Sequence, residues 1–376
     1  MNEEQLTART REFIGLHVVQ SADLLRTEPA LGRQRLQAAA CAGLTGIQVP
    51  EKLGGSGLSF RCKANIATIL AGADFGLAMS WINTHNVAAD LARWLDQPIA
   101  NTWLPGLLSG QMIGCTALTE PLAGSDFSAI RTVATRVPGG WRLDGEKSWI
   151  INGKIADVML VYAQTQPGQG APGIACFVVD ARRAGFERDS QSSPSSVASS
   201  FTGGFHLKAY IAHEAELIHP PGTAFSRALA SINGARVSVA AMCCGMVAES
   251  LRIANEYGQS RLTFGKSLAS HQGWRWSLAD AAIDLHAAQL MVAQASAQID
   301  AGKDAQDLAA KTKVFATRMA QRHIAALMHA LGAQGLRDTY PLMRHLQATQ
   351  VATLTDGSTE MLLERISKNL NKTLGQ

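Results

Sequence analysis

The chain has 376 residues, of which 47% are hydrophobic and 17% charged, so it is long enough for two or three packed units and too apolar for a disordered protein. Its net charge of +4 includes no run of five or six basic residues, which argues against a nucleic-acid surface but suits a substrate that carries phosphates. The six cysteines show no Cys-x-x-Cys spacing, nothing before residue 20 resembles a signal sequence and no apolar run approaches membrane length, so we expect reduced thiols in a cytoplasmic protein that has no membrane contact.

Residues 1–113 show the long polar-apolar periods that are typical of helices. The Ala- and Leu-rich stretch 35–44 is one example. Residues 46–57 contain Pro50 and several glycines, which predict a glycine-rich turn between two helices. We therefore expect an N-terminal helical domain.

Residues 114–221 consist of short apolar runs divided by turn pairs. The runs at 158–162 and 174–179 predict strands. The turn pairs that should separate strands are Pro138-Gly139, Asp144-Gly145 and Asn152-Gly153. This zone predicts a middle β-domain.

Two segments of this zone call for separate interpretation. Residues 168–173 fit the dinucleotide pattern G-x-G-x-x-G, but a strand follows them and Pro172 lies inside, so we expect a hairpin loop. Residues 190–204 are rich in serine, which predicts a flexible loop.

Residues 222–376 return to a helical pattern. One helix face is predicted from apolar residues at steps of three and four, namely Leu278, Ala281, Leu285, Ala288, Val292 and Ala295. Gly302 should end that helix. His271, His323 and His329 have no metal-ligand spacing, so no metal site is expected. The order helices, strands, helices predicts an α+β chain that is mainly α, with domains at 1–113, 114–221 and 222–376.

Two segments of the β-zone combine groups that suit a planar, heteroatom-rich ring such as a flavin. They are residues 115–126, Cys-Thr-Ala-Leu-Thr-Glu-Pro-Leu-Ala-Gly-Ser-Asp, and residues 145–153, Gly-Glu-Lys-Ser-Trp-Ile-Ile-Asn-Gly. Pro121 and Gly124 predict an irregular backbone that turns free amides and the hydroxyls of Thr119 and Ser125 toward a ligand. Trp149 adds a flat face and one N–H donor.

A third segment, residues 257–272, offers groups for a dinucleotide. Arg261 can bind a pyrophosphate with two parallel hydrogen bonds. Phe264, four residues beyond a helix end, can stack on an adenine. The side-chain amide of Gln272 offers both a donor and an acceptor to a further edge of such a ligand.

These segments, together with Pro50-Glu51-Lys-Leu-Gly-Gly-Ser-Gly57, resemble the acyl-CoA dehydrogenase family over nearly the whole chain. The resemblance implies an N-terminal helical domain, a middle β-barrel-like domain and a C-terminal four-helix bundle. It also implies FAD as cofactor, electron-transfer flavoprotein as electron acceptor, and a homo-oligomer (dimer or tetramer) in which residues 261–272 serve the FAD of a neighbouring subunit.

The resemblance also implies which residues form the site. The cofactor-binding residues are Leu118, Thr119, Gly124, Ser125, Trp149, Ile151, Arg261, Phe264, Gln272, His329, Gly332, Ser358 and Glu360. The substrate-binding residues are Ser125, Arg236, Asp356 and Gly357. Arg236 should precede a long helix.

Asp356 is the predicted catalytic base. The family carries a glutamate that removes the α-proton of an acyl thioester while hydride passes to flavin N5, and counting fifteen residues from Pro341, as in the family, reaches Asp356. An aspartate remains a carboxylate base whose pKa can rise beside an apolar substrate, although its reach is ~1.5 Å shorter. The backbone N–H of Asp356 would activate the thioester carbonyl, as in the family.

Several residues depart from the family pattern around the reacting centre. Ile151 stands where relatives usually have a threonine, Gln347-Ala348 replaces Arg-Asp, Ala333 replaces a glycine and His329 replaces a glutamine. The leading hypothesis is α,β-dehydrogenation of an acyl thioester of coenzyme A or of a carrier protein. The alternatives are a flavin monooxygenase or a thioester elimination enzyme on the same fold, and a binding protein that lacks FAD.

Overall fold

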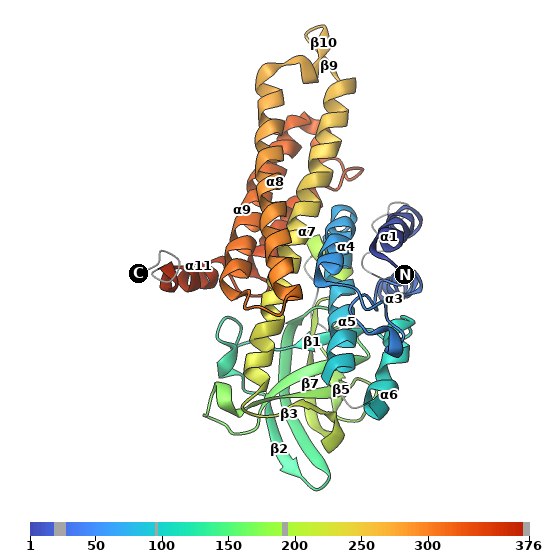
Figure 1. The fold of residues 1–376 in the computed structure, drawn as a ribbon, viewed down its shortest axis with the longest axis vertical. Coiled ribbons are helices and arrows are strands. Elements are labelled where there is room, and N and C mark those ends of the chain that lie inside the picture. Colours follow the sequence, from blue (N-terminus) through green and yellow to red (C-terminus); the bar gives the residue numbers. More distant parts are fainter. Residues whose placement is uncertain (19–27, 95–96, 190–194, 371–376) are drawn as a thin grey trace. The chain divides into compact units, whose positions relative to one another are not determined.

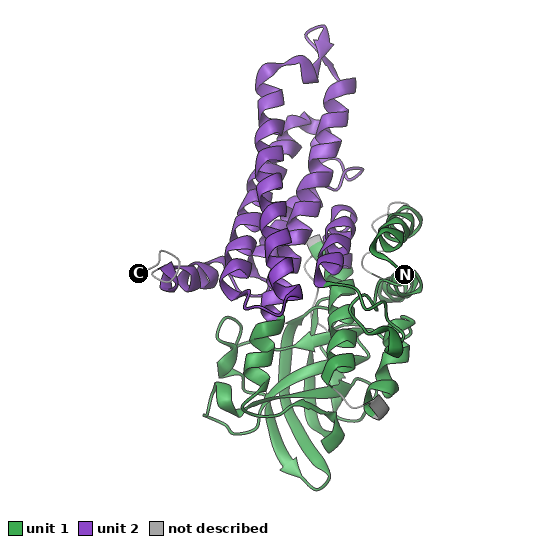
Figure 2. Cartoon of the chain, in the orientation of Figure 1, with its two compact units in different colours: residues 1–59, 79–231 green, residues 60–78, 232–376 purple. Residues whose placement is uncertain are grey.

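The computed structural model describes the chain except residues 19–27, 95–96, 190–194 and 371–376. The chain forms two compact units that are interleaved in sequence (Figure 2). The first unit consists of residues 1–59 and 79–231, and the second of residues 60–78 and 232–376. Because these units group segments by contact, the three-domain division at residues 113 and 221 stays a prediction.

The first unit combines helices with a sheet (Figure 1). Its helices are α1 (Glu3–His17), α3 (Pro29–Cys41), most of α5 (Phe75–Trp94), α6 (Gln97–Leu108) and the first residues of α7 (Ala224–Ser260). Its strands are β1 (Gly114–Ala117), β2 (Val133–Val137), β3 (Gly140–Ile150), β4 (Val158–Gln164), β5 (Ile174–Asp180), β6 (Phe186–Arg188), β7 (Gly203–His213) and β8 (Leu217–His219).

The eight strands form one mostly antiparallel sheet in the order β6-β7-β3-β2-β4-β5-β8, with β1 pairing in parallel with β4. Every residue of β4 and β5 is buried, as their continuous apolar runs predict. Apolar side chains of α5 and α6 pack with β4 and β5 in one core. Ala123 and Ile130, which follow β1, pack in the same core.

The predicted strands at 158–162 and 174–179 and two of the predicted turns are confirmed, and a third turn is wrong. Pro138 and Gly139 close the β2–β3 hairpin, and residues 168–173 connect antiparallel β4 and β5. Asp144-Gly145 was predicted as a turn, and this is wrong: the pair lies inside β3, where the register with β7 shifts. Gly145 has φ 153°, and an added Cβ would lie 2.6 Å from the Cα of Thr132, so glycine is required there as a bulge.

The Ser-rich stretch 190–204 is only partly described. Residues 190–194 lie outside the described residues, residues 195–200 form 3-10 turns, and Gly203 and Gly204 already belong to β7. The expected loop is therefore shorter than the sequence predicts at its C-terminal end.

The second unit is helical. Its helices are α4 (Phe60–Ala73), the remainder of α7, α8 (Gln272–Asp300), α9 (Gln306–Ala330), α10 (Leu342–Leu354) and α11 (Thr359–Lys368). The short strands β9 (Leu262–Thr263) and β10 (Lys266–Ser267) form a hairpin between α7 and α8. Helix α9 contacts α8, α10 and α11, and α4 contacts α8. The predicted α+β, mainly α fold class is confirmed.

The predicted face of α8 is the one that the helix buries, from Leu278 through Ala295. Gly302 follows its C-terminus at φ 66°. The carboxylate of Asp300 accepts the backbone N–H groups of Phe60 and Arg61, at 2.6 and 3.2 Å, and so caps the start of α4.

Helix α7 corrects one expectation from the sequence. An 18-residue window of α7 reaches a mean hydropathy of 1.5, so one helix of the described chain is long and apolar enough to cross a membrane. Because 78% of that window is buried inside the protein, α7 has the features of a core helix.

Candidate functional site

The turn from Leu118 to Ser125 follows β1 and presents polar groups to solvent. Its backbone closes through hydrogen bonds between Glu120 and Ala123, so the predicted irregular turn is confirmed. Gly124 does not adopt a positive φ, and an added Cβ there would meet nothing within 4 Å. Nothing in the protein interior therefore requires glycine at this position, and its open backbone is free for close approach by a ligand.

A buried ion pair fixes this turn to β3. The Nζ atom of Lys147 lies 2.8 Å from Oε1 of Glu120 and donates to the carbonyl of Leu118 at 3.1 Å. Glu120 also accepts the Thr132 hydroxyl at 2.6 Å. Burial opposes ionisation of Glu120, but Lys147 and these hydrogen bonds outweigh it and lower the pKa of the carboxyl. Burial lowers the pKa of Lys147 to about 8, so the pair is charged at neutral pH.

Trp149 lies near the end of β3, two residues beyond Lys147. The N–H of Ser148 donates to the carbonyl of Thr119 at 3.1 Å, which places the two predicted flavin segments side by side. Trp149 has φ 59°, a left-handed conformation, and its side chain is 63% exposed. An exposed indole on a constrained backbone is unusual for a core residue and suits a platform for a planar ligand.

Ile151 and the turn after it are held by polar contacts. Asn152, which is fully buried with φ 64°, donates through Nδ2 to the carbonyls of Ser80 and Gly114 at 2.8 and 2.9 Å. Ile151 itself is partly buried and has no hydroxyl to offer.

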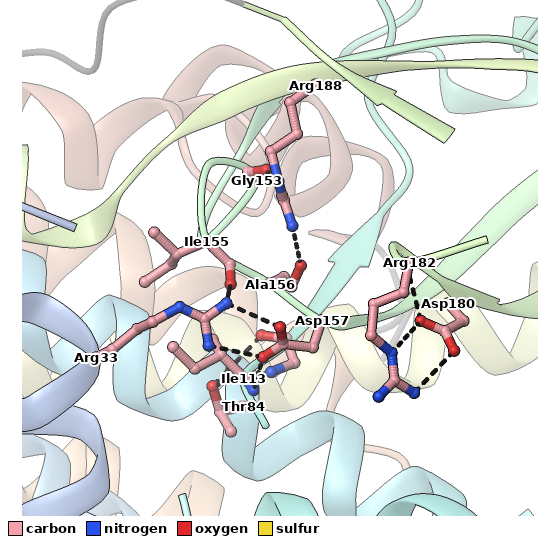
Figure 3. A network of polar contacts seen from close by, with 11 residues as sticks. Arg33, Thr84, Ile113, Gly153, Ile155, Ala156, Asp157, Asp180, Arg182 and Arg188 are labelled. Atoms are coloured by element: carbon pink, nitrogen blue, oxygen red, sulfur yellow. Dashed lines mark hydrogen bonds and ion pairs between the residues drawn. The ribbon is translucent and has the colours of Figure 1, made fainter. Parts of the chain in front are cut away.

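Two arginines hold the carbonyls of the loop that leads from this turn to β4 (Figure 3). Arg188 donates to the carbonyls of Gly153, at 2.6 Å, and of Ala156. Arg33 donates to the carbonyl of Ile155 and forms two hydrogen bonds with the carboxylate of Asp157 at 2.8 and 2.9 Å. The loop beside Trp149 is thus fixed largely through its main-chain carbonyls.

In the second unit, Asp356 lies in the loop between α10 and α11. Arg236 donates from Nε to the carbonyl of Asp356 at 2.9 Å and from its terminal nitrogen to Asn233 at 2.8 Å. Lys313 of α9 donates from Nζ to the carbonyls of Thr355 and of Gly357, the latter at 2.5 Å. Arg236 lies inside α7, so the expectation that it precedes a long helix is wrong; the helix simply begins earlier, at Ala224.

The Asp356 carboxyl has the electrostatic environment of a base. Its burial raises its pKa above the ordinary value, while the charges of Lys313 and Arg236 oppose this rise. Both cations donate to main-chain carbonyls, and the Asp356 carboxylate accepts no hydrogen bond from any residue that the structure describes. A carboxylate with a raised pKa and unoccupied lone pairs is suited to accept a proton.

The other predicted residues of this loop lie at the start of α11. Gly357 has φ 101°, and an added Cβ would meet the Arg236 guanidinium at 3.3 Å. Ser358 is the N-cap of α11 and accepts the N–H of Met361 at 3.4 Å. Glu360 is exposed in the first turn of the helix.

Arg261, Phe264 and Gln272 lie together at the α7–α8 connection. Phe264 has φ 51° and is 93% exposed at the tip of the β9–β10 hairpin. His329 and Gly332 lie at the same end of the bundle, because Trp274 near the start of α8 donates to the carbonyl at the end of α9. Figure 1 shows this hairpin at one end of the bundle and α11 toward the other.

The structure thus brings the predicted residues into three groups. One is the turn with Trp149, the second is Arg236 with the Asp356 loop, and the third is the hairpin end of the bundle. Sequence reasoning missed Lys147 and Lys313 as partners of these groups. Lys313 could have been predicted from the sequence, because a lysine inside an apolar helix face indicates a buried partner. Among the described residues, no cluster of three His, Cys, Asp or Glu side chains could hold a metal ion.

Comparison with known proteins matches three successive domains of the chain. Models of the N-terminal, middle and C-terminal domains of acyl-CoA dehydrogenases match residues 1–111, 115–209 and 223–371. An acyl-CoA dehydrogenase of Bacillus subtilis (strain 168) is 29% identical over 379 residues, covering 98% of both chains.

Solved structures show the same likeness. Butyryl-CoA dehydrogenase from Megasphaera elsdenii has a TM-score of 0.92 at 26% identity, covering 98% of this chain and 97% of that chain. A glutaryl-CoA dehydrogenase from Mycobacterium smegmatis in complex with FADH2 has a TM-score of 0.90 at 26% identity, covering 98% of this chain and 94% of that chain. With three successive domain models matched in order, the chain belongs to the acyl-CoA dehydrogenase family and is an oxidoreductase that acts on CH–CH groups.

Proposed function

We propose that this protein uses FAD to dehydrogenate an acyl thioester between its α and β carbons, with Asp356 as the base that removes the α-proton. One observation carries the proposal. The Asp356 carboxylate has a raised pKa and no hydrogen-bonding partner among the described residues, while its own carbonyl is held by Arg236.

The residues present fit FAD. Trp149 offers an exposed indole face, and the hydroxyls of Thr119 and Ser125 make no hydrogen bond to other described residues. These groups would hold the isoalloxazine ring, and Arg261 with Phe264 would hold a pyrophosphate and an adenine. When bound, FAD supplies the hydride acceptor at N5.

Asp356 would perform two tasks in the reaction. Its carboxylate removes the α-proton, and its backbone N–H donates to the thioester oxygen on which negative charge develops. Because proton removal requires the ionised form, the rate should rise with pH through the pKa of Asp356, which lies above its ordinary value. The shorter side chain of an aspartate makes the position of its loop decisive.

The substrate class and partners follow from family membership. We propose an acyl thioester of coenzyme A or of a carrier protein, electron-transfer flavoprotein as the electron acceptor, and a homo-oligomer as the working form. The butyryl- and glutaryl-CoA dehydrogenases that this fold resembles support a coenzyme A thioester.

Anaerobic titration of Asp356→Asn with a panel of acyl thioesters tests the proposal. Asparagine is nearly isosteric and tolerates the left-handed backbone, so the variant should keep its yellow flavin and lose substrate-dependent bleaching. The exposed Asp338→Asn is the matched control and should bleach like the wild type. Unchanged bleaching in Asp356→Asn would refute Asp356 as the base.

The same assay separates dehydrogenation from the alternative, a flavin monooxygenase, which the departures at Ile151 and Asp356 suggest. Anaerobic turnover with a dye acceptor supports the dehydrogenase and excludes an obligatory oxygen reaction. Oxygen consumption coupled to a hydroxylated product, with no anaerobic turnover, would replace our proposal by the alternative.

A further inference from the structure

Lys313 is a buried cation that the reaction described above does not use. It lies on α9 and is 1% exposed. Its Nζ atom donates to the carbonyls of Thr355 and of Gly357, on either side of Asp356. With the hydrogen bond from Arg236 to the carbonyl of Asp356, two cations hold three successive main-chain carbonyls.

The backbone that these cations hold is strained. Asp356 has φ 57° and Gly357 has φ 101°, so two successive residues lie in the left-handed region. Only glycine adopts that region freely, and an aspartate there persists when surrounding contacts impose it. No helix or strand hydrogen bonding is available to this loop, which lies between the C-cap of α10 and the N-cap of α11.

The cations bind carbonyls and leave the carboxylate free. Lys313 and Arg236 lie close enough to lower the pKa of Asp356, yet neither donates a hydrogen bond to its side chain. A direct ion pair would occupy the carboxylate lone pairs and weaken it as a base. Holding the main chain instead fixes the position of the carboxylate without neutralising it.

We propose that Lys313 is a positioning residue for the base: by fixing the carbonyls of Thr355 and Gly357, it sets where the carboxylate and the N–H of Asp356 lie. This inference rests on the proposed function, because it assigns Asp356 the role of base. Lys313 touches neither substrate nor cofactor in this scheme and acts through the loop alone.

Lys313 has donors enough for both carbonyls whether it is charged or neutral. Burial lowers its pKa to about 8, and Asp356 partly opposes this, while Arg236 and the neighbouring Cys243 of α7 also face it. A neutral amine still carries two N–H groups for two carbonyl acceptors. Deprotonation therefore removes the charge beside Asp356 while the loop stays held.

Lys313→Met tests the positioning role, with Lys311→Met as the matched control. Lys311 is on the same helix, but it pairs with Asp307 at 2.6 Å and is 30% exposed. Hydrogen–deuterium exchange of apo protein should become faster in the peptide 354–361 of Lys313→Met, with exchange elsewhere in α9 and α10 unchanged. Lys311→Met should exchange there as the wild type does.

Kinetics give the second readout. In Lys313→Met, kcat should fall about 10- to 100-fold while KM and flavin content change little, since a small displacement of a base has a steep effect. The rising limb of the pH profile should move to higher pH, because a positive charge that lowers the pKa of Asp356 has been removed. Lys313→Arg keeps the charge and at least two donors. It should return the rising limb of the pH profile to its wild-type position and slow the exchange of peptide 354–361 again.

The outcomes separate this inference from the proposed function. If Lys313→Met has the exchange rates, the kcat and the pH profile of the wild type, the positioning role is overturned. Faster exchange throughout the protein, with no recovery in Lys313→Arg, would also overturn it, because it shows a general stability effect. If Asp356→Asn retains bleaching, the proposed function fails instead, whatever the Lys313 variants do to exchange.

Discussion

Trp149 and Asp356 share a backbone feature that few non-glycine residues adopt. Their φ angles are 59° and 57°, in the left-handed region. Aspartate is enriched there because its short side chain tolerates the crowding, whereas a bulky tryptophan is a true outlier. An aspartate at position 356 is therefore compatible with the left-handed backbone of this loop.

Trp149→Gly separates stability from cofactor binding at this residue. Glycine relieves the left-handed strain, which stabilises the fold, but its greater freedom in the unfolded chain destabilises it. Because the two effects nearly cancel, the free energy of unfolding of the apo protein should change by less than about 1 kcal/mol. FAD affinity, measured by fluorescence titration, should weaken up to about 10-fold, because an aromatic contact contributes ~0.5–1.5 kcal/mol.

The buried Trp81 is the control for this variant. It is 1% exposed and donates to the carbonyl of Leu44 at 3.1 Å. Trp81→Ala should cost about 3–5 kcal/mol of stability. If Trp149→Gly destabilises the protein to a similar extent, Trp149 is a core residue and not a platform.

At the scale of elements, main-chain carbonyls of loops are held by cationic side chains from elsewhere in the same unit. Arg33 and Arg188 hold the loop before β4, Lys147 holds the turn after β1, and Lys313 holds the loop before α11. A loop without ladder hydrogen bonds leaves its carbonyls unsatisfied, and a cationic side chain that donates to them both satisfies and immobilises them.

Glu120→Gln tests the pair that holds the turn after β1. Removing the carboxylate charge leaves Lys147 buried without its counter-ion, which should cost about 3–5 kcal/mol in urea unfolding at pH 7. The pKa of Glu120 is lowered in the folded state, so its contribution is present above its unfolded value of 4.5 and is lost as pH falls below it. The difference from wild type should therefore shrink in acid.

Adding Lys147→Met to Glu120→Gln provides the control. The double variant removes both charges, and it should be closer in stability to wild type than Glu120→Gln alone. A double variant that is less stable by the sum of both single effects would mean that Glu120 and Lys147 act independently.

At the scale of the molecule, the second unit contains two of the three groups of predicted site residues. These are Arg236 with the Asp356 loop, and the hairpin end of the bundle, and they are too far apart to contact the same part of a ligand. Arg236 and Ser260 are on one helix, so they are ~36 Å apart at about 1.5 Å per residue, and Arg261 follows directly. On α8, large apolar side chains are exposed at seven-residue spacing, at Trp276, Ile283 and Leu290. Such a stripe suits contact with another helix. The resemblance to the family predicts that the hairpin of a second copy serves the site of the first.

Complementation between two inactive variants tests this arrangement. Arg261→Gln should lose FAD affinity, and Asp356→Asn should keep FAD but not reduce it. Refolded or co-expressed as a mixture, the two should regain about a quarter of wild-type activity, because mixed pairs contain one site with both an intact base and an intact hairpin. A mixture no more active than its components, although co-purification of differently tagged subunits shows mixed oligomers, would place both residues in one subunit's site.

Much of the fold could be predicted because its signals are local. The apolar runs of β4 and β5, the buried face of α8 and the turn at Gly302 each depend on neighbouring residues only. The error at Asp144-Gly145 has the opposite cause, because a bulge rather than a turn results when β7 pairs across it.

By itself the sequence determined the family, the order of helices and strands, and the identity of Trp149 and Asp356 as residues of interest. Only the tertiary structure decided that Trp149 is exposed and that Lys313 lies against the Asp356 loop. The reason is physical: a buried lysine finds its carbonyls some forty residues along the chain, and no local period records which loop the fold brings to it.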